Sequence, residues 1–355
     1  MRRLLIALCP VPVLVALACA DAPPKTARER QNLIGPVRSI RIDQVSFSRR
    51  DGTWVPGPRL PSYITRFTVD GHQTGMLYYG DDGCLRAKRT WLYDEKGNEV
   101  EQASYNPDRS LDCRFVKLYD AQGRLIQQEW CGEDGVAWGK EIYTYDAAGH
   151  VIETAHYDTN PDFYVGKVVT KYDASGRWIE AVEYDSDGTP GMKQTRSYDA
   201  QGRLIEEVDY RSPHDVDVKI VHRYNPEGQH VEESSCPEGA FLGSRDYYTY
   251  DKMGNLIRDE RWLYEPGGTV TGKWVGVYDA RGHETDDLWY GPDGAVKRHA
   301  TSTYEFDATG NWTKQTVKEY VVEGGKVDLA KMTVNYQAVT YYDGRTASPA
   351  TPQDD

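Results

Sequence analysis

The sequence predicts an all-β protein built from tandem β-hairpins of about 26 residues each. A six-residue phrase, Tyr-Asp-x-x-Gly-Arg, recurs along most of the chain, as at Tyr198–Arg203. The chain also contains 26 tyrosines and 9 tryptophans, which favour extended, half-buried sheet. The apolar residues show no helical period. The expected architecture is a long, curling antiparallel meander sheet.

The N-terminal part of the chain is expected to serve export. Two arginines, a short apolar stretch and then small residues give residues 1–18 the three-part form of a secretory signal peptide. Cys19 stands where a bacterial lipobox has its lipidated cysteine, but an ordinary A-x-A cleavage site directly precedes it, and both alternatives stay open. Residues 19–34 are polar and contain prolines, so we expect a lipidated or flexible tether.

Two series of turns divide residues 35–343 into hairpins. The first series is marked by a glycine that recurs with a period near 26 residues, and we call these the landmark glycines. The second, looser series, such as GDDG at 80–83 and GPDG at 291–294, falls between them. Two turns per repeat leave two strands, so each repeat is a β-hairpin. Residues 344–355 have a disordered composition and are expected to form a tail. The landmark glycines are Gly71, Gly97, Gly123, Gly149, Gly176, Gly202, Gly228, Gly254, Gly282 and Gly310.

The recurring phrase is explained by turn chemistry. In a three-residue hairpin loop, Gly202 takes the positive φ that other residues avoid. Asp199 suits the first turn position because its side chain can accept hydrogen bonds from the backbone two residues on. The loop places Asp199 beside Arg203 and Tyr198 opposite Leu204, which sets the predicted register.

A column of glutamates, each four residues after a landmark glycine, is the feature of the repeat that most suggests a binding site. One interpretation is an acidic groove for cations or basic ligands. The other is ordinary cross-strand pairing, with Arg196 opposite Glu206 and His222 opposite Glu232, and this interpretation is favoured. The column comprises Glu101, Glu153, Glu180, Glu206 and Glu232.

Two of the four cysteines beyond the signal region are candidates for a disulfide. The predicted register places Cys113 opposite Cys131, and an exported protein meets oxidising conditions that would allow a bridge. The states of Cys84 and Cys236 are left open. No C-x-x-C motif occurs, so the sequence predicts no zinc or redox site.

The Tyr-Asp-x-x-Gly-Arg/Asn phrase, as at Tyr119–Arg124 and Tyr250–Asn255, resembles the YD repeats of the Rhs family over roughly residues 67–312. In that family, such hairpins form a long curling sheet that builds a shell around a toxin. The period here is wider, and no D-P-x-G-x-x-G-type processing motif is present. The resemblance therefore implies the sheet and not the delivery of a toxin.

Charge and motifs narrow the function. A net charge of −13 without basic patches argues against nucleic acid as a partner. The known hydrolase, phosphate-binding and metalloprotease motifs are missing, so no catalytic residue, cofactor or metal is predicted. The expected role is a non-catalytic scaffold or binding module of the cell envelope, located in the periplasm or outer membrane, including its outer surface, and attached only through an N-terminal lipid.

Its expected partner is a protein or glycan of the envelope. The alternative is a hydrolase of polysaccharide or cell wall that uses carboxylates brought together by curling. The irregular first hairpin and two irregular loops can carry specificity, although terminal repeats can also be irregular merely as caps. The candidate ligand contacts are Trp138, Trp130, His214 and Phe241.

Overall fold

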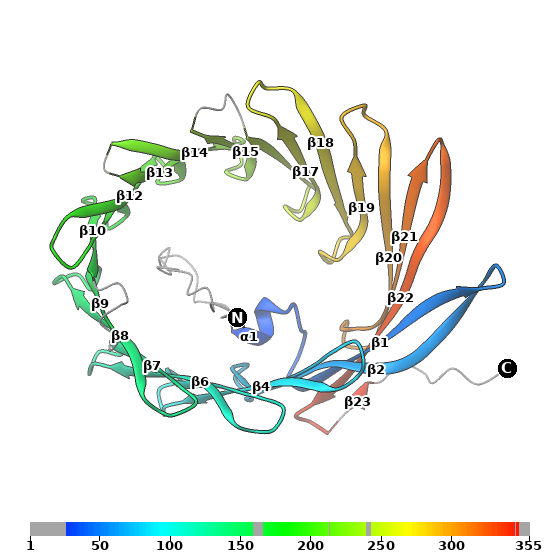
Figure 1. The fold of residues 1–355 in the computed structure, drawn as a ribbon, viewed down its shortest axis with the longest axis horizontal. Helices are drawn as coiled ribbons and strands as arrows, with labels where there is room; N and C mark the ends of the chain where they lie inside the picture. The colour runs from blue at the N-terminus through cyan, green and yellow to red at the C-terminus, as the bar shows by residue number, and fades with distance from the viewer. Residues whose placement is uncertain (1–25, 159–165, 213, 239–242, 345, 348–355) are drawn as a thin grey trace, which may run out of the picture.

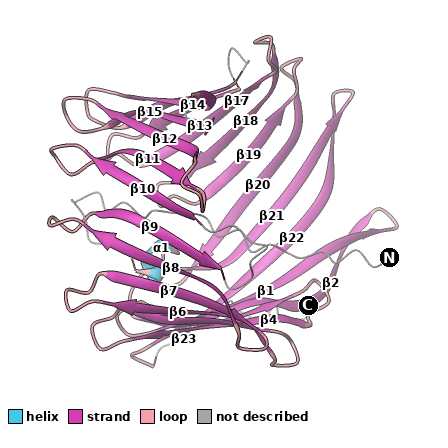
Figure 2. Cartoon of the chain, turned by 60° about the vertical axis from the view of Figure 1, so that its left-hand side comes forward, coloured by secondary structure: helices cyan, strands magenta, loops and turns pink. Residues whose placement is uncertain are grey.

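A computed structural model describes residues 26–158, 166–212, 214–238, 243–344 and 346–347 (Figures 1 and 2). Nearly all of this part of the chain belongs to one antiparallel sheet. The prediction of an all-β meander of hairpin repeats is confirmed. The sheet goes further than curling, because β1 pairs with β22 as well as with β2 and so closes the ring into a barrel.

The elements follow one another as hairpins around the ring. They are α1 (Ala27–Arg30), β1 (Val37–Arg50), β2 (Thr53–Phe67), β3 (Gln73–Tyr79), β4 (Leu85–Tyr93), β5 (Glu99–Tyr105), β6 (Leu111–Tyr119), β7 (Leu125–Gly132), β8 (Ala137–Tyr145), β9 (Val151–Asp158), β10 (Gly166–Tyr172), β11 (Trp178–Tyr184), β12 (Pro190–Tyr198), β13 (Leu204–Ser212), β14 (Asp215–Tyr224), β15 (His230–Pro237), β16 (Ser244–Tyr250), β17 (Leu256–Tyr264), β18 (Val270–Tyr278), β19 (Glu284–Tyr290), β20 (Val296–Phe306), β21 (Trp312–Glu323), β22 (Lys326–Tyr341) and β23 (Thr346–Ala347).

The turns have the predicted geometry. All ten landmark glycines have positive φ, from 76° at Gly176 to 101° at Gly310. In the turn after β12, Asp199 Oδ1 accepts hydrogen bonds from the backbone N–H groups of Gln201 and Arg203, at 3.0 and 2.9 Å. Across the turn, Arg203 Nε also forms an ion pair with Asp199 Oδ2 at 2.7 Å. The turn phrase is therefore a local structural unit.

The register inside each hairpin differs from the simple prediction by one residue. Tyr198 does lie opposite Leu204, but the next pair is Ser197 with Glu206. A β-bulge directly after the turn thus adds one residue to the outgoing strand, and it recurs after the turns at Gly97, Gly123, Gly149 and Gly176. Every pair beyond the bulge is displaced by one position.

The bulge overturns the predicted disulfide. Cys113 lies opposite Gly132, and Cys131 lies opposite Arg114, because the register shifts between Leu118 and Tyr119. Paired residues share a face of the sheet and alternate residues change face, so Cys113 and Cys131 point to opposite faces. The two cysteines are not bonded to each other.

The glutamate column keeps its pairing role with different partners. Arg196 lies opposite Glu207 rather than Glu206, and His222 lies opposite Glu233 rather than Glu232. Glu206 instead forms an ion pair with Lys219 at 2.7 Å. The other members pair likewise: Glu153 with Lys167 and Glu180 with Lys171, at 2.7 and 2.6 Å, Glu101 with Arg114 at 3.9 Å, and Glu232 with Arg223 and Arg245, at 3.7 and 3.4 Å. These contacts support cross-strand pairing over an acidic groove.

The tyrosine of the turn phrase connects neighbouring strands. The Tyr198 hydroxyl donates a hydrogen bond of 2.8 Å to the carbonyl of Trp178, the first residue of β11. The bond spans 20 residues, as it does for most members of the set. This contact explains why tyrosine precedes the aspartate. The same bond is made by Tyr93, Tyr119, Tyr145, Tyr172, Tyr224 and Tyr250, and by Tyr304, which lies two residues before the phrase position held by Phe306.

Residues 26–34, which include α1, lie inside the ring (Figure 1). Thr26 and Glu29 form a capping box that starts the one-turn helix α1, an element that was not among those predicted from the sequence. Ala27 and Leu33 are buried in the core cluster with residues of β1, β2 and β22. Residues 26–34, expected to belong to a tether, thus pack on the barrel.

The remaining segments bear on the other terminal predictions. The signal peptide, Cys19 and Phe241 lie outside the described residues. In the predicted tail, β23 pairs with the end of β22 through Val339–Ala347 and Thr340–Thr346. Among the described residues, no helix is long and apolar enough to cross a membrane.

Candidate functional site

The inner face of the barrel can be assigned from the strand register. Ile40 lies opposite both Thr65 and Val339, and Ile42 lies opposite both Tyr63 and Gln337. Ile40 and Val339 belong to the cluster that packs with Leu33 of the segment inside the ring. Because paired residues share a face, this face of β1, β2 and β22 looks into the barrel.

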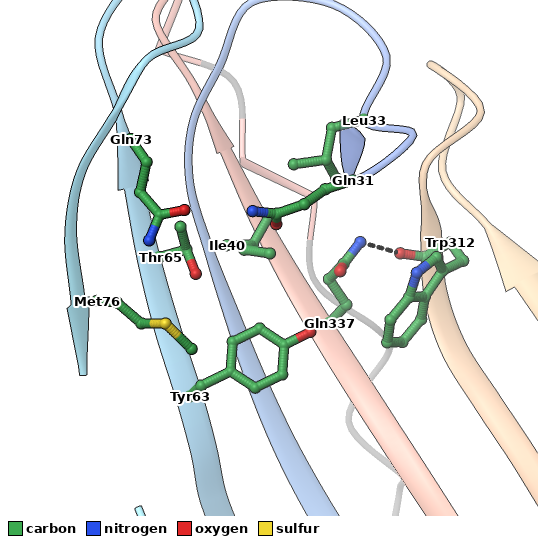
Figure 3. Close-up of a pocket in the computed structure, with 9 residues that line it drawn as sticks. All are labelled: Gln31, Leu33, Ile40, Tyr63, Thr65, Gln73, Met76, Trp312 and Gln337. Atoms are coloured by element: carbon green, nitrogen blue, oxygen red, sulfur yellow. Dashed lines mark hydrogen bonds between the residues drawn. The ribbon is translucent and has the colours of Figure 1, made fainter. Parts of the chain in front are cut away.

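A cavity of about 350 Å³ lies on this inner face where the barrel closes (Figure 3). We call it the closure cavity. Side chains from the segment directly after α1, from β1 to β3 and from β21 and β22 surround it. Figure 3 shows these side chains pointing toward a common space. Its lining residues are Gln31, Leu33, Ile40, Tyr63, Thr65, Gln73, Met76, Trp312 and Gln337.

The closure cavity is lined by neutral polar groups on an aromatic and aliphatic frame. Gln337 is 2% exposed, and its Nε2 donates a hydrogen bond of 2.8 Å to the carbonyl of Trp312. The Tyr63 hydroxyl is a donor at neutral pH, and burial raises its pKa further above the ordinary value of 10.0. Amides and hydroxyls both donate and accept, so such a cavity suits an uncharged, polyhydroxylated ligand.

A ladder of amides continues along the inner face beside the cavity. Gln44 Nε2 donates to Asn335 Oδ1 at 3.1 Å, and Asn335 Nδ2 donates to Gln315 Oε1 at 2.9 Å. Gln315 Nε2 in turn donates to the Tyr304 hydroxyl at 3.0 Å. The ladder crosses four strands, and each amide fixes the orientation of the next. It forms a rigid, neutral hydrogen-bonding wall.

A second cavity, of about 270 Å³, lies farther along β19 to β21 and is acidic. Glu284, Asp287 and Glu319 line it together with Arg298. Burial, followed by the charge of Asp287, raises the pKa of Glu284. Burial also raises the pKa of Asp287 and outweighs the opposing effect of Arg298. We call this the acidic cavity.

Three of the four predicted ligand contacts belong to the described residues, and they lie elsewhere on the barrel. Trp138 is 51% exposed, and its indole ring covers Gly132 on the neighbouring strand. Trp130 is half-buried and packs over Gly139 in the same hairpin. His214 is exposed in the turn before β14. The structure does not bring these residues into the closure cavity.

The regular repeats gave no sequence signal for the closure cavity. Its residues come mainly from the first and last hairpins, where β1, β2, β21 and β22 are longer than the strands of the regular repeats. The irregular first hairpin was the only sequence signal for this region. Gln337 and Trp312 are far from that hairpin in sequence, so their contribution depended on ring closure.

Comparisons with known proteins give only distant likenesses. No protein-family model matches the chain, and no curated protein matches it. The TcdB2-TccC3-Cdc42 crystal structure is similar at 13% identity and a TM-score of 0.32, over 88% of this chain and 19% of that chain. The chain thus spans about a fifth of that protein's length.

Two porin-like proteins are also similar. One from Bacteroides uniformis matches at 11% identity and a TM-score of 0.28, over 86% of this chain and 97% of that chain. One from Bacteroides vulgatus matches at 11% identity and a TM-score of 0.24, over 71% and 96%. At these TM-scores the likenesses carry no functional argument, and the YD-repeat resemblance rests on the sequence motif.

Proposed function

We propose that this protein is an exported, non-catalytic binding module of the cell envelope that holds part of a glycan in the closure cavity. The observation that carries the proposal is the lining of that cavity by neutral amides and hydroxyls beside the rings of Trp312 and Tyr63. Sugar hydroxyls pair with such groups, and sugar rings pack on aromatic faces. A small concave site with a few fixed polar groups is the usual form of a ligand pocket.

The buried amides support selectivity for a polar ligand. Gln337 is held by the Trp312 carbonyl, and the amide ladder holds its members in the same way, so these groups are oriented before a ligand arrives. A pre-oriented site loses less conformational entropy on binding than a mobile one. The net charge of −13 adds a preference for neutral or cationic glycans over nucleic acid.

Retention of the mature protein on a glycan array, followed by titration calorimetry, tests this proposal. Replacing one hydrogen-bonding amide, Gln31→Ala, is expected to weaken binding about 3–10-fold, the effect of one lost hydrogen bond. Trp312→Ala is expected to weaken it further. Gln201→Ala is the matched control, because Gln201 is exposed in a regular turn. Unchanged affinity in both cavity variants would reject the cavity as the site.

The surface around Trp138 is the competing location for a ligand. A cavity of about 310 Å³ in this region is lined partly by Ala137, Gly139 and Tyr157. If Trp138→Ala abolishes glycan or protein capture while Trp312→Ala does not, the binding module is retained and its site moves to this hairpin. If neither glycans nor envelope proteins are retained by the wild-type protein, the binding function itself is wrong.

Hydrolysis is the second candidate function, favoured by one observation in the acidic cavity. Glu284 and Asp287 have raised pKa values there, and Asp287 Oδ1 is buried without a hydrogen-bond partner among the described residues. A protonated carboxyl beside an ionised one is the requirement for glycoside hydrolysis. Release of reducing ends by the wild type, lost in both Glu284→Gln and Asp287→Asn, would establish it in place of simple binding.

Anchoring through Cys19 belongs to the same proposal. A lipid on this residue would attach the protein to a membrane, with the barrel in the periplasm or on the cell surface. Labelling with radioactive palmitate, compared between wild type and Cys19→Ala, tests it. Equal labelling of the two proteins would exclude Cys19 as the lipidated residue.

A further inference from the structure

Four titratable side chains converge on one stretch of the barrel wall away from both cavities. Glu207 comes from β13, His222 from β14, and His230 and Glu233 from β15. His222 and Glu233 are directly paired, so they share a face of the sheet. Followed strand by strand from Ile42, the register places that face on the inside of the barrel.

Three of these side chains aim donor atoms at a common point. His222 Nδ1 lies 3.3 Å from His230 Nε2 and 3.5 Å from Glu233 Oε2. One donor atom from each of the three residues lies within 4.8 Å of the others. Metal–nitrogen bonds of about 2.0–2.1 Å in a tetrahedral zinc site give donor atoms about 3.3 Å apart. The two separations from His222 Nδ1 are therefore close to the edge length of such a site.

A fourth residue fixes the orientation of the central histidine. His222 Nε2 lies 3.1 Å from Glu207 Oε1, and Arg196 holds the Glu207 carboxylate at 2.7 Å. The side chain of His222 is only 9% exposed, which limits its other orientations. Metal-binding histidines characteristically donate the ring N–H that does not bind the metal to a carboxylate. Glu207 and His222 have this arrangement.

The hydrogen bond to Glu207 also explains why a cation fits between the other groups. When His222 donates its Nε2–H to Glu207, Nδ1 carries a lone pair and no proton. That lone pair then lies 3.5 Å from the Glu233 carboxylate and 3.3 Å from His230 Nε2, which can donate an N–H to it when no ion is bound. A divalent cation would take the place of that N–H and bind all three donor atoms.

We infer that His222, His230 and Glu233 form a three-ligand site for a zinc-type divalent transition-metal ion. Two imidazoles and one carboxylate are suitable ligands for such an ion, and the fourth tetrahedral corner is left for water or a ligand in the barrel. The sequence predicted no metal, because the ligands follow none of the known spacings and one of them comes from the neighbouring strand. This inference does not depend on glycan binding.

Calorimetric titration of the chelator-treated, full-length mature protein with ZnCl₂ tests the site. The protein must lack a histidine tag. We expect one ion per chain and a rise in Tm with zinc concentration, because binding to the folded state alone stabilises it. A parallel titration with CoCl₂ should give the absorption spectrum of tetrahedral cobalt with nitrogen and oxygen ligands.

Variants separate this site from adventitious binding. His230→Gln should abolish stoichiometric binding, whereas Glu207→Gln should leave the ligands in place and weaken binding about 10–100-fold. His156→Gln is the matched control, since His156 pairs with Glu141 at 3.2 Å without a second histidine. Circular dichroism would verify that each variant is folded. Zinc affinity that is equal in wild type and His230→Gln, or no stoichiometric binding to the wild type, would overturn the inference.

Discussion

The side-chain amide of Asn311 forms two hydrogen bonds with the backbone of Ile34, a residue 277 positions earlier in the chain. Asn311 Oδ1 accepts from the Ile34 N–H at 2.7 Å, and Nδ2 donates to the Ile34 carbonyl at 2.8 Å. The same Nδ2 reaches the Tyr341 hydroxyl at 2.7 Å. Asn311 thus ties the N-terminal segment to the two last long strands at the place where the barrel closes.

Removal of this amide should loosen the N-terminal segment. Asn311 is 2% exposed, and Asn311→Ala removes its two part-buried hydrogen bonds to the Ile34 backbone, so it is expected to cost about 1–3 kcal/mol in the free energy of unfolding. Urea denaturation measures the loss, and limited proteolysis should show earlier cleavage near α1. Asn255→Ala is the control, because Asn255 holds the same post-glycine position but bonds only to Asp251 in its own turn. Equal losses in the two variants would contradict the special role of Asn311.

A landmark glycine should be costly to replace because of its backbone angle. Gly123 has a φ of 82°, and a Cβ added there would meet no atom within 4 Å, so Gly123→Ala tests conformation without a clash. We expect a loss of about 1–2 kcal/mol in the free energy of unfolding, the cost of the left-handed region for alanine. Gly267→Ala is the control, since Gly267 has equal space and an ordinary φ. Thermal unfolding of both variants would show whether the difference exists.

The turn-phrase tyrosines that hydrogen-bond to neighbouring strands should make the stability of the barrel fall at alkaline pH. Burial, followed by the charges of Glu99 and Asp94, raises the pKa of Tyr119 to about 12, from an ordinary value of 10.0. The folded state therefore favours the protonated phenol. The stability from this group is fully present below pH 10 and is lost as pH rises toward 12.

Tyr119→Phe tests this dependence. At neutral pH, the variant should lose about 1 kcal/mol with the hydrogen bond to the Glu99 carbonyl. Between pH 10 and 12 its stability should fall less steeply than that of the wild type, because one titrating group is gone. Denaturant unfolding at both pH values gives the two slopes. Parallel slopes would show that Tyr119 titrates alike in the folded and unfolded states.

Thiol labelling should report the corrected register. Cys84 is exposed, whereas Cys131 is 5% exposed. An alkylating reagent should therefore modify Cys84 in the native protein and Cys131 only after unfolding. Mass spectrometry of tryptic peptides without reduction should show no peptide that links Cys113 to Cys131. Such a linked peptide would mean that the bulge after Gly123 is absent.

The short-range structure was predictable because it is encoded in contiguous residues. The positive φ of Gly202, the acceptor role of Asp199 and the pairing of Tyr198 with Leu204 all follow from neighbouring residues of one turn. Two turns per repeat then determined the antiparallel hairpins. Composition added the class, because a chain rich in tyrosine and tryptophan packs well as sheet.

The bulge and its consequences could not be predicted from the residues of the turn phrase. One inserted residue leaves the turn phrase unchanged but exchanges the faces of every later side chain, which separated Cys113 from Cys131 and gave Glu206 a lysine partner. The glutamates therefore kept their role while each individual pair was predicted one position away.

The sequence alone thus determined the repeat and the strands, since these depend on interactions within one hairpin. Only the tertiary structure decided the closure of β1 on β22, the insertion of α1 and the residues of the cavities. Closure depends on twist and curvature accumulated over all the strands, and each repeat adds a share too small to appear in its own residues. Gln337 and Gln31, or His222 and Glu207, become neighbours through that accumulated geometry and through register, neither of which has a local signature.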